Sequence, residues 1–136
     1  MKRILLIDDH DEIRRLLREF LEPSGYHVTD AASVDEALAL QDGAQFDLLV
    51  TDICMPGKNG LRAIADFKAT SPKIRVIAIS GGPAAGTTQD GSRTVYHDLL
   101  DEAIEMGAES ALIKPFDREQ LLNAVSQALG KEQPTL

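Results

Sequence analysis

Several residue types are scarce in this chain, and each shortage excludes a class of protein. The 136 residues include one cysteine, Cys54, so neither an intrachain disulfide nor a cluster of thiolate metal ligands can form. Long apolar runs are also missing. The first apolar run begins at Ile4 and stops at Asp8 after four residues, which is too short for a signal peptide. No apolar run in the chain approaches the length that spans a membrane. We therefore expect a cytoplasmic protein with no membrane partner.

Positive charge is in short supply as well. Lys and Arg number 14 against 22 Asp and Glu, which gives a formal net charge of −8. No basic cluster is long enough to follow a phosphate backbone, so direct nucleic-acid binding is not expected. Aromatic residues make up only 4% of the chain and apolar residues 43%, enough for one core of aliphatic side chains. We expect one domain over residues 1–130 and a C-terminal tail over 131–136.

Short apolar runs alternate with amphipathic segments along the chain. The runs predict strands at 4–7, 26–31, 46–51, 74–79 and 111–113. The segments between and after them predict helices at 11–21, 33–40, 60–70, 95–106 and 117–129. Asp11, Ser33 with Glu36, and Asp117 are the expected N-terminal caps. This alternation predicts a doubly wound α/β domain, with a five-stranded parallel sheet and helices on both faces.

Polar residues suited to phosphoryl chemistry end or follow four of the apolar runs. They are Asp8 and Asp9, Asp52, Ser80 and Lys114. Because the carboxyl ends of parallel strands meet at one edge of a sheet, we expect these side chains to share one acidic pocket. The three carboxylates offer the oxygen ligands that Mg²⁺ prefers, and Asp52, which stands alone, is the expected nucleophile. Lys114 and Ser80 would contact the phosphoryl oxygens.

The order and spacing of these residues resemble one protein family. Asp8-Asp9, the stretch from Asp52 to Gly60 that reads Asp-x-x-Met-Pro-x-x-x-Gly, Ser80, and Lys114-Pro115-Phe116 are similar to the receiver domain of bacterial two-component response regulators. The resemblance spans about residues 2 to 130. It implies a flavodoxin-like sheet with the strand order 2-1-3-4-5.

The resemblance also implies a role for each site residue. A histidine kinase or histidine phosphotransfer protein would phosphorylate Asp52. Mg²⁺ would be held by Asp8, Asp9, Asp52 and the backbone carbonyl of Cys54. Lys114 would contact the phosphoryl group, and Ser80 would be the switch residue whose movement a downstream protein target reads. The Lys114–Pro115 bond is a candidate cis peptide bond.

Some features depart from the family pattern or fall outside it. Ala111 stands where receivers commonly carry Tyr or Phe, and the segment between Ser80 and Lys114 is longer by about ten residues. Residues 81–88 only loosely fit the spacing of a phosphate-binding loop, because Thr87 replaces the required lysine. We instead expect the glycine-rich stretch 81–94 to be a mobile loop that faces a partner. The histidines have no spacing partner for a metal site and are expected at the surface; they are His10, His27 and His97.

The interpretation that we favour is a stand-alone receiver. It would be a phosphoacceptor switch that assists its own phosphorylation and dephosphorylation and is not a turnover enzyme. One alternative is a receiver-like adaptor that is never phosphorylated and binds its partner through residues 81–94. A second is an aspartate-nucleophile phosphohydrolase of the haloacid dehalogenase type. That class uses a second Asp two residues after the nucleophile, whereas Asp8 is followed by Asp9 and His10.

Overall fold

A computed structural model describes residues 2–41, 45–53, 60–80 and 101–130. The strands form one parallel sheet in the order β2-β1-β3-β4-β5. Their bounds are β1 (Arg3–Ile7), β2 (His27–Ala31), β3 (Leu48–Asp52), β4 (Arg75–Ser80) and β5 (Ser110–Ile113). The predicted five-stranded, flavodoxin-like sheet is therefore confirmed.

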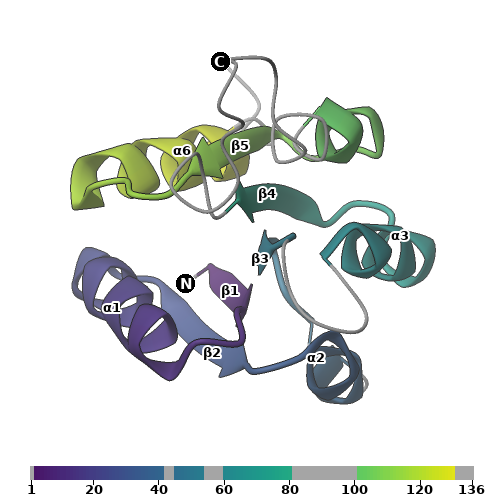
Figure 1. The fold of residues 1–136 in the computed structure, drawn as a ribbon, viewed down its shortest axis with the longest axis horizontal. Helices are drawn as coiled ribbons and strands as arrows, with labels where there is room; N and C mark the ends of the chain where they lie inside the picture. Colours follow the sequence, from purple (N-terminus) through teal and green to yellow (C-terminus); the bar gives the residue numbers. More distant parts are fainter. Residues whose placement is uncertain (1, 42–44, 54–59, 81–100, 131–136) are drawn as a thin grey trace, which may run out of the picture.

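Helices cover both faces of the sheet, as Figure 1 shows. One face carries α1 (Asp11–Leu21) and α6 (Arg118–Gly130), and the other carries α2 (Val34–Gln41) and α3 (Gly60–Thr70). A 3₁₀ turn, η1 (Glu22–Ser24), follows α1, and residues 101–105 are helical. The expected helix over 95–106 is thus observed as far as residue 105, with a turn at 106. Its first part, 95–100, lies outside the described residues, as do the stretch 81–94 and the tail 131–136. None of the helices in the described part of the chain combines the length and the apolar character of a membrane-spanning segment.

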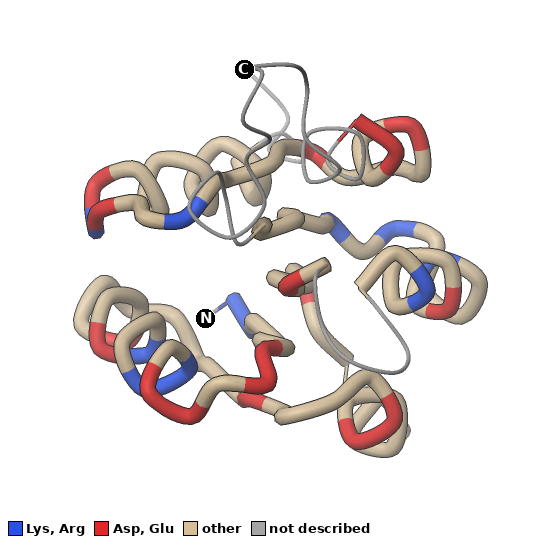
Figure 2. Tube along the Cα trace, viewed as in Figure 1, with Lys and Arg blue, Asp and Glu red and all other residues tan. Residues whose placement is uncertain are grey.

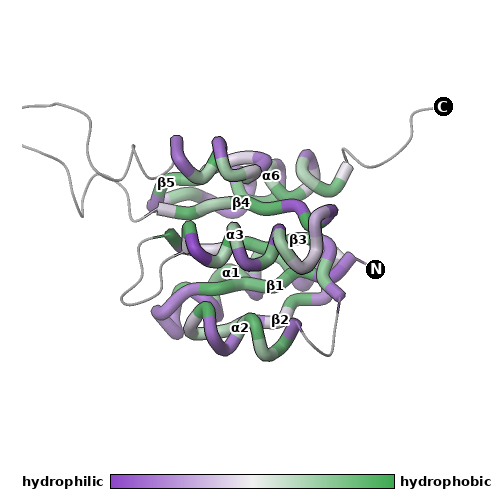
Figure 3. Tube along the Cα trace, turned by 90° about the vertical axis from the view of Figure 1, so that its right-hand side faces the viewer, coloured by the Kyte–Doolittle hydropathy of each residue, from purple (hydrophilic) through white to green (hydrophobic). Residues whose placement is uncertain are grey.

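Two layers of apolar side chains, one on each face, hold the helices to the sheet. Leu5 of β1 packs in the layer that contains Phe67 of α3. The next residue, Leu6, packs in the opposite layer with Leu17 of α1 and Val125 of α6. Successive side chains of a strand point to opposite faces, so a strand buried on both sides reads as a continuous apolar run. Figure 3 shows the strands largely in the colour of hydrophobic residues, whereas the helices alternate between hydrophobic and hydrophilic residues.

Two of the predicted helix caps are present. Ser33 Oγ accepts a hydrogen bond from the Glu36 N–H at 3.1 Å, and Glu36 Oε1 accepts one from the Ala32 N–H at 2.6 Å. Asp117 Oδ1 accepts from the Gln120 N–H at 2.8 Å, while Gln120 Oε1 accepts from the Asp117 N–H at 2.9 Å. Each pair satisfies backbone N–H groups at the start of a helix that have no partner within it, which explains why α2 and α6 begin where they do.

The cap predicted for α1 is wrong. His10 occupies the N-cap position and makes no side-chain hydrogen bond to the helix. Asp11 lies one position later, in the first turn, where its carboxylate pairs with Arg14. An acidic residue is favourable at either position, because both lie close to the positive end of the helix dipole. Residue type alone therefore could not distinguish them.

Candidate functional site

An acidic cluster lies at the carboxyl edge of the sheet. β1 leads directly into Asp8 and Asp9, and Asp52 ends the neighbouring strand β3. Figure 2 shows the acidic segments side by side at the ends of these two strands. These three residues and His10 each offer one ligand atom, and the four atoms lie within 4.8 Å of one another. The edge expected from the sequence thus brings the three carboxylates together.

Two of these carboxylates are buried, and one lysine bridges them. Asp8 is 1% exposed and Asp52 is 3% exposed, which is rare for charged groups. Lys114 Nζ donates to Asp8 Oδ2 at 3.0 Å and to Asp52 Oδ2 at 3.1 Å. Burial acts to lower the pKa of Lys114, but the charges of Asp52 and Asp8 outweigh it, so the pKa is raised. The lysine is therefore held as an ammonium between two carboxylates.

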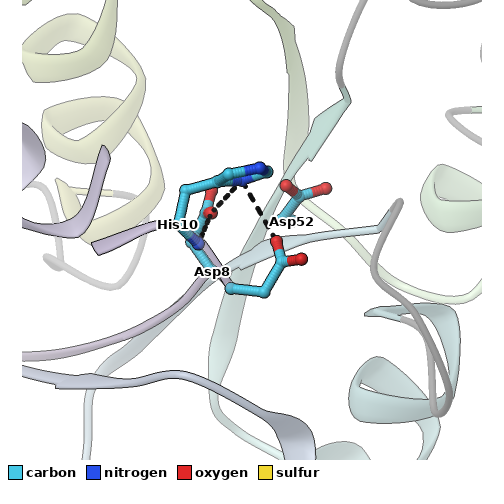
Figure 4. Close-up of side chains that lie close together, drawn as sticks. Asp8, His10 and Asp52 are labelled. Atoms are coloured by element: carbon cyan, nitrogen blue, oxygen red, sulfur yellow. Dashed lines mark hydrogen bonds and ion pairs between the residues drawn. The ribbon is translucent and has the colours of Figure 1, made fainter. Parts of the chain in front are cut away.

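The other oxygen of Asp8 faces His10. Asp8 Oδ1 accepts a hydrogen bond from the His10 main-chain N–H at 2.9 Å and lies 3.2 Å from His10 Nδ1. The same ring nitrogen lies 3.2 Å from Asp9 Oδ1. Figure 4 shows the Asp8 and Asp52 carboxylates close together with the imidazole beside them. The His10 side chain is 66% exposed, as expected, but its contact with the acidic pair was missed.

One carboxylate oxygen in the cluster has no hydrogen bond. Asp9 Oδ1 is buried and accepts none from the residues that the structure describes, although the His10 ring nitrogen lies 3.2 Å away as an ion-pair contact. A buried acceptor that makes no hydrogen bond costs about 1–3 kcal/mol, and a bound cation reduces that cost. Asp9 therefore has the property expected of a cation ligand. Cys54, whose backbone carbonyl was the fourth expected ligand, lies outside the described residues.

Ser80 and Lys114 are neighbours at the same edge. Ser80 ends β4 and is fully buried, and its carbonyl accepts a hydrogen bond from the Lys114 N–H at 3.0 Å. The Lys114–Pro115 peptide bond is cis, as the sequence suggested. Ala111 pairs with Ala78 of β4 and packs against the core layer that contains α3. The edge thus carries every predicted site residue that lies within the described part of the chain.

Gly60 supports the site in a way that the sequence prediction missed. A Cβ atom at this position would lie 2.2 Å from the Asp52 carbonyl oxygen and 2.6 Å from the Ile53 Cα. Contacts that short do not occur, so only glycine lets α3 begin directly against the end of β3. From the sequence, Gly60 was placed next to a helix and at the end of the Asp-x-x-Met-Pro-x-x-x-Gly stretch, but not against Asp52. Its place at the end of the Asp-x-x-Met-Pro-x-x-x-Gly stretch was the available signal.

The comparisons with known proteins agree with this architecture. The family model described as the response regulator receiver domain matches residues 4–126. Protein CcdB of Bacillus subtilis is 36% identical over 131 residues, which cover 96% of this chain and 99% of CcdB. Sporulation initiation phosphotransferase F of the same organism is 31% identical over 128 residues, which cover 94% of each protein.

Solved structures give the same result. A response regulator receiver domain protein from Clostridium thermocellum superimposes with a TM-score of 0.82 at 27% identity, with 98% of each chain covered. The chain also spans 27% of the transcriptional regulatory protein AlgB of Pseudomonas aeruginosa and 50% of ResD of Bacillus subtilis, which are longer proteins. With its strand order and acidic edge, the chain belongs to the response regulator receiver domain family of two-component systems.

Proposed function

We propose that Asp52 accepts a phosphoryl group in a Mg²⁺-dependent reaction, from a histidine kinase or a histidine phosphotransfer protein. One observation carries this proposal: the Asp52 carboxylate is buried at the strand edge, 3.1 Å from the Lys114 ammonium and beside the Asp8–Asp9 pair. A carboxylate in such a place is shielded from bulk water and faces a cation that can also contact an incoming anion.

The residues present fit a magnesium ion. Asp8, Asp9 and Asp52 supply hard oxygen ligands within reach of one another, and Asp9 Oδ1 accepts no hydrogen bond among the described residues. The cluster holds three carboxylates, and Lys114 bridges two of them, so an added positive charge would be favourable there. We propose that these three side chains and the Cys54 carbonyl hold the ion. When bound, it would offset the charge of the phosphoryl oxygens.

The protein's own groups divide the remaining work. An Asp52 carboxylate oxygen attacks phosphorus, and the bond from phosphorus to the donor's nitrogen or oxygen breaks as the new bond forms. Lys114, which now bridges Asp52 and Asp8, would shift its contact to a phosphoryl oxygen. Ser80 would donate its hydroxyl to another. The charge added at Asp52 would then alter a surface that a partner protein reads.

The comparisons support a receiver that acts through protein contacts. CcdB and sporulation initiation phosphotransferase F match this chain over almost their whole lengths, and the second name describes phosphoryl transfer. We therefore propose a receiver that relays a phosphoryl group or binds a target protein when phosphorylated. The unphosphorylated adaptor weighed in the sequence analysis is the alternative.

Incubation with Mg²⁺ and acetyl phosphate, followed by intact-protein mass spectrometry, tests the proposal. The wild type is expected to gain the mass of one phosphoryl group, and the gain should disappear on chelation of Mg²⁺ and in Asp52→Asn. No gain in the wild type would favour the adaptor. An equal gain in Asp52→Asn would show that another residue is the acceptor.

A further inference from the structure

Arg14 links three parts of the fold through one guanidinium group. Nη1 donates to the main-chain carbonyl of Asp8 at 2.6 Å, and Nε donates to Asp30 Oδ2 on β2 at 3.0 Å. Nη2 donates to Asp11 in the first turn of α1. The side chain is 14% exposed, so most of it is shielded from water. Each guanidinium nitrogen therefore has its own partner, in an arrangement that suits the rigid fork of an arginine.

The contact with Asp8 falls on the peptide group between two proposed metal ligands. The Asp8 N–H donates to the Ala31 carbonyl at 3.2 Å, and the Asp8 carbonyl accepts from Arg14. Because a peptide group is planar, the direction of the Asp8 carbonyl sets the plane from which Asp9 begins. Arg14 is therefore placed to restrict the orientation of this peptide group, and among the described residues it makes no hydrogen bond to the carboxylate of Asp8 or Asp9.

We propose that Arg14 is a positioning residue of the metal site. It holds the Asp8–Asp9 peptide so that both carboxylates face one ion. This inference rests on the proposed function, since it concerns the same Mg²⁺ site. Groups that orient metal ligands commonly change metal affinity by about 10–100-fold when they are removed.

The sign of the effect separates positioning from charge. A cation close to a Mg²⁺ site repels the ion, so a purely electrostatic Arg14 would weaken Mg²⁺ binding, and its removal would strengthen it. If Arg14 positions the ligands, its removal weakens Mg²⁺ binding despite the relief of repulsion. The two accounts therefore predict opposite changes in the dissociation constant.

Arg18 provides a matched control on the same helix. It donates to Asp30 Oδ1 at 3.1 Å and to Glu22 Oε2 at 2.8 Å. No hydrogen bond from Arg18 to Asp8 or Asp9 is present among the described residues. Arg14→Met and Arg18→Met each remove one positive charge and one contact with Asp30, but only the first removes the bond to the Asp8 carbonyl.

The experiment is a Mg²⁺ titration of wild type and variants by calorimetry, without a phosphodonor. Arg14→Met should bind Mg²⁺ about tenfold more weakly, with Arg18→Met unchanged. Arg14→Lys, which keeps the charge but not the fork, should also bind more weakly than wild type. Thermal unfolding shows whether Arg14→Met is folded. If it is not, the Mg²⁺ affinity of Arg14→Lys tests the inference in its place.

Two results would overturn the inference. One is Mg²⁺ binding by the Arg14 variants that is as tight as in the wild type, or tighter. The other is an equal loss in Arg14→Met and Arg18→Met. A wild type that binds no Mg²⁺ would instead contradict the proposed function, so the two failures can be told apart.

Discussion

Lys114 Nζ lies 3.1 Å from Asp52 Oδ2, and the same nitrogen lies 3.0 Å from Asp8 Oδ2. These side chains come from the ends of three strands and meet only because the sheet is parallel and ordered as it is. The ammonium compensates two buried carboxylates at once. Lys114 therefore stabilises the fold, and in our proposal it also contacts the phosphoryl group.

Removing this ammonium should destabilise the protein when Mg²⁺ is absent. Lys114→Met leaves Asp8 and Asp52 buried without their shared cation, at a cost of about 2 kcal/mol in the free energy of unfolding. Urea unfolding measures that cost. Saturating Mg²⁺ should stabilise the variant more than it stabilises the wild type, because the ion replaces the lost charge. A variant as stable as the wild type without Mg²⁺ would contradict this account.

The raised pKa of Lys114 predicts a pH dependence with a definite sign. The folded state binds this proton more tightly than the unfolded chain does. The resulting stability is complete below the ordinary lysine pKa, about 10.4, and is lost as the pH rises through the higher folded value. The stability difference between wild type and Lys114→Met should therefore shrink above about pH 10. A difference that stays constant into that range would refute the assignment.

Gly60→Ala should damage both stability and phosphorylation. The added methyl group would overlap the Asp52 carbonyl, so α3 or the end of β3 must shift, at a cost of about 1–3 kcal/mol. The shift would also displace Asp52 and slow its phosphorylation. Gly130→Ala is the matched control, since a Cβ there has nothing within 4 Å. Thermal unfolding and the rate of mass gain with acetyl phosphate check both variants, and similar behaviour of the two would exclude this role.

His10→Ala should strengthen Mg²⁺ binding a few-fold. The imidazole nitrogen lies 3.2 Å from Asp8 Oδ1 and from Asp9 Oδ1, the oxygens that a hard cation would use. The ring therefore competes with Mg²⁺ for these oxygens, and its removal should favour the ion. The main-chain N–H of residue 10, which also binds Asp8, stays in place. Calorimetric titration measures the change, and His27→Ala, at the exposed start of β2, is the control. Weaker binding in His10→Ala would mean that the ring helps to hold the ion.

The sheet and most of its acidic edge could be predicted from the sequence, for physical reasons. A strand buried on both faces needs consecutive apolar residues, and Leu5 and Leu6 show why, since each packs into a different layer. The start of β3 was placed two residues too early, at Phe46. Asp47 instead accepts a hydrogen bond from the Arg3 N–H through its carboxylate at 2.8 Å, before the strand begins.

The contacts around the edge were harder to predict. His10 approaches Asp8 through the turn after β1, and Gly60, at the start of α3, lies against the main chain of Asp52. Arg14 reaches the Asp8 carbonyl from the helix that follows. Each contact depends on the path of the backbone between elements, and apolar periodicity carries no information about that path. The helices and strands were therefore predictable from the sequence, whereas the contacts of these supporting residues were visible only in the structure.

The identity of the phosphorylated residue is the central claim, and borohydride trapping tests it most directly. Reduction of an acyl phosphate converts the acceptor aspartate to homoserine, which peptide mass spectrometry locates in the sequence. After incubation with Mg²⁺ and acetyl phosphate, we predict homoserine at position 52 and none at position 8 or 9. Homoserine at position 8, as a phosphohydrolase that uses Asp8 would give, or none at any aspartate, would contradict the account.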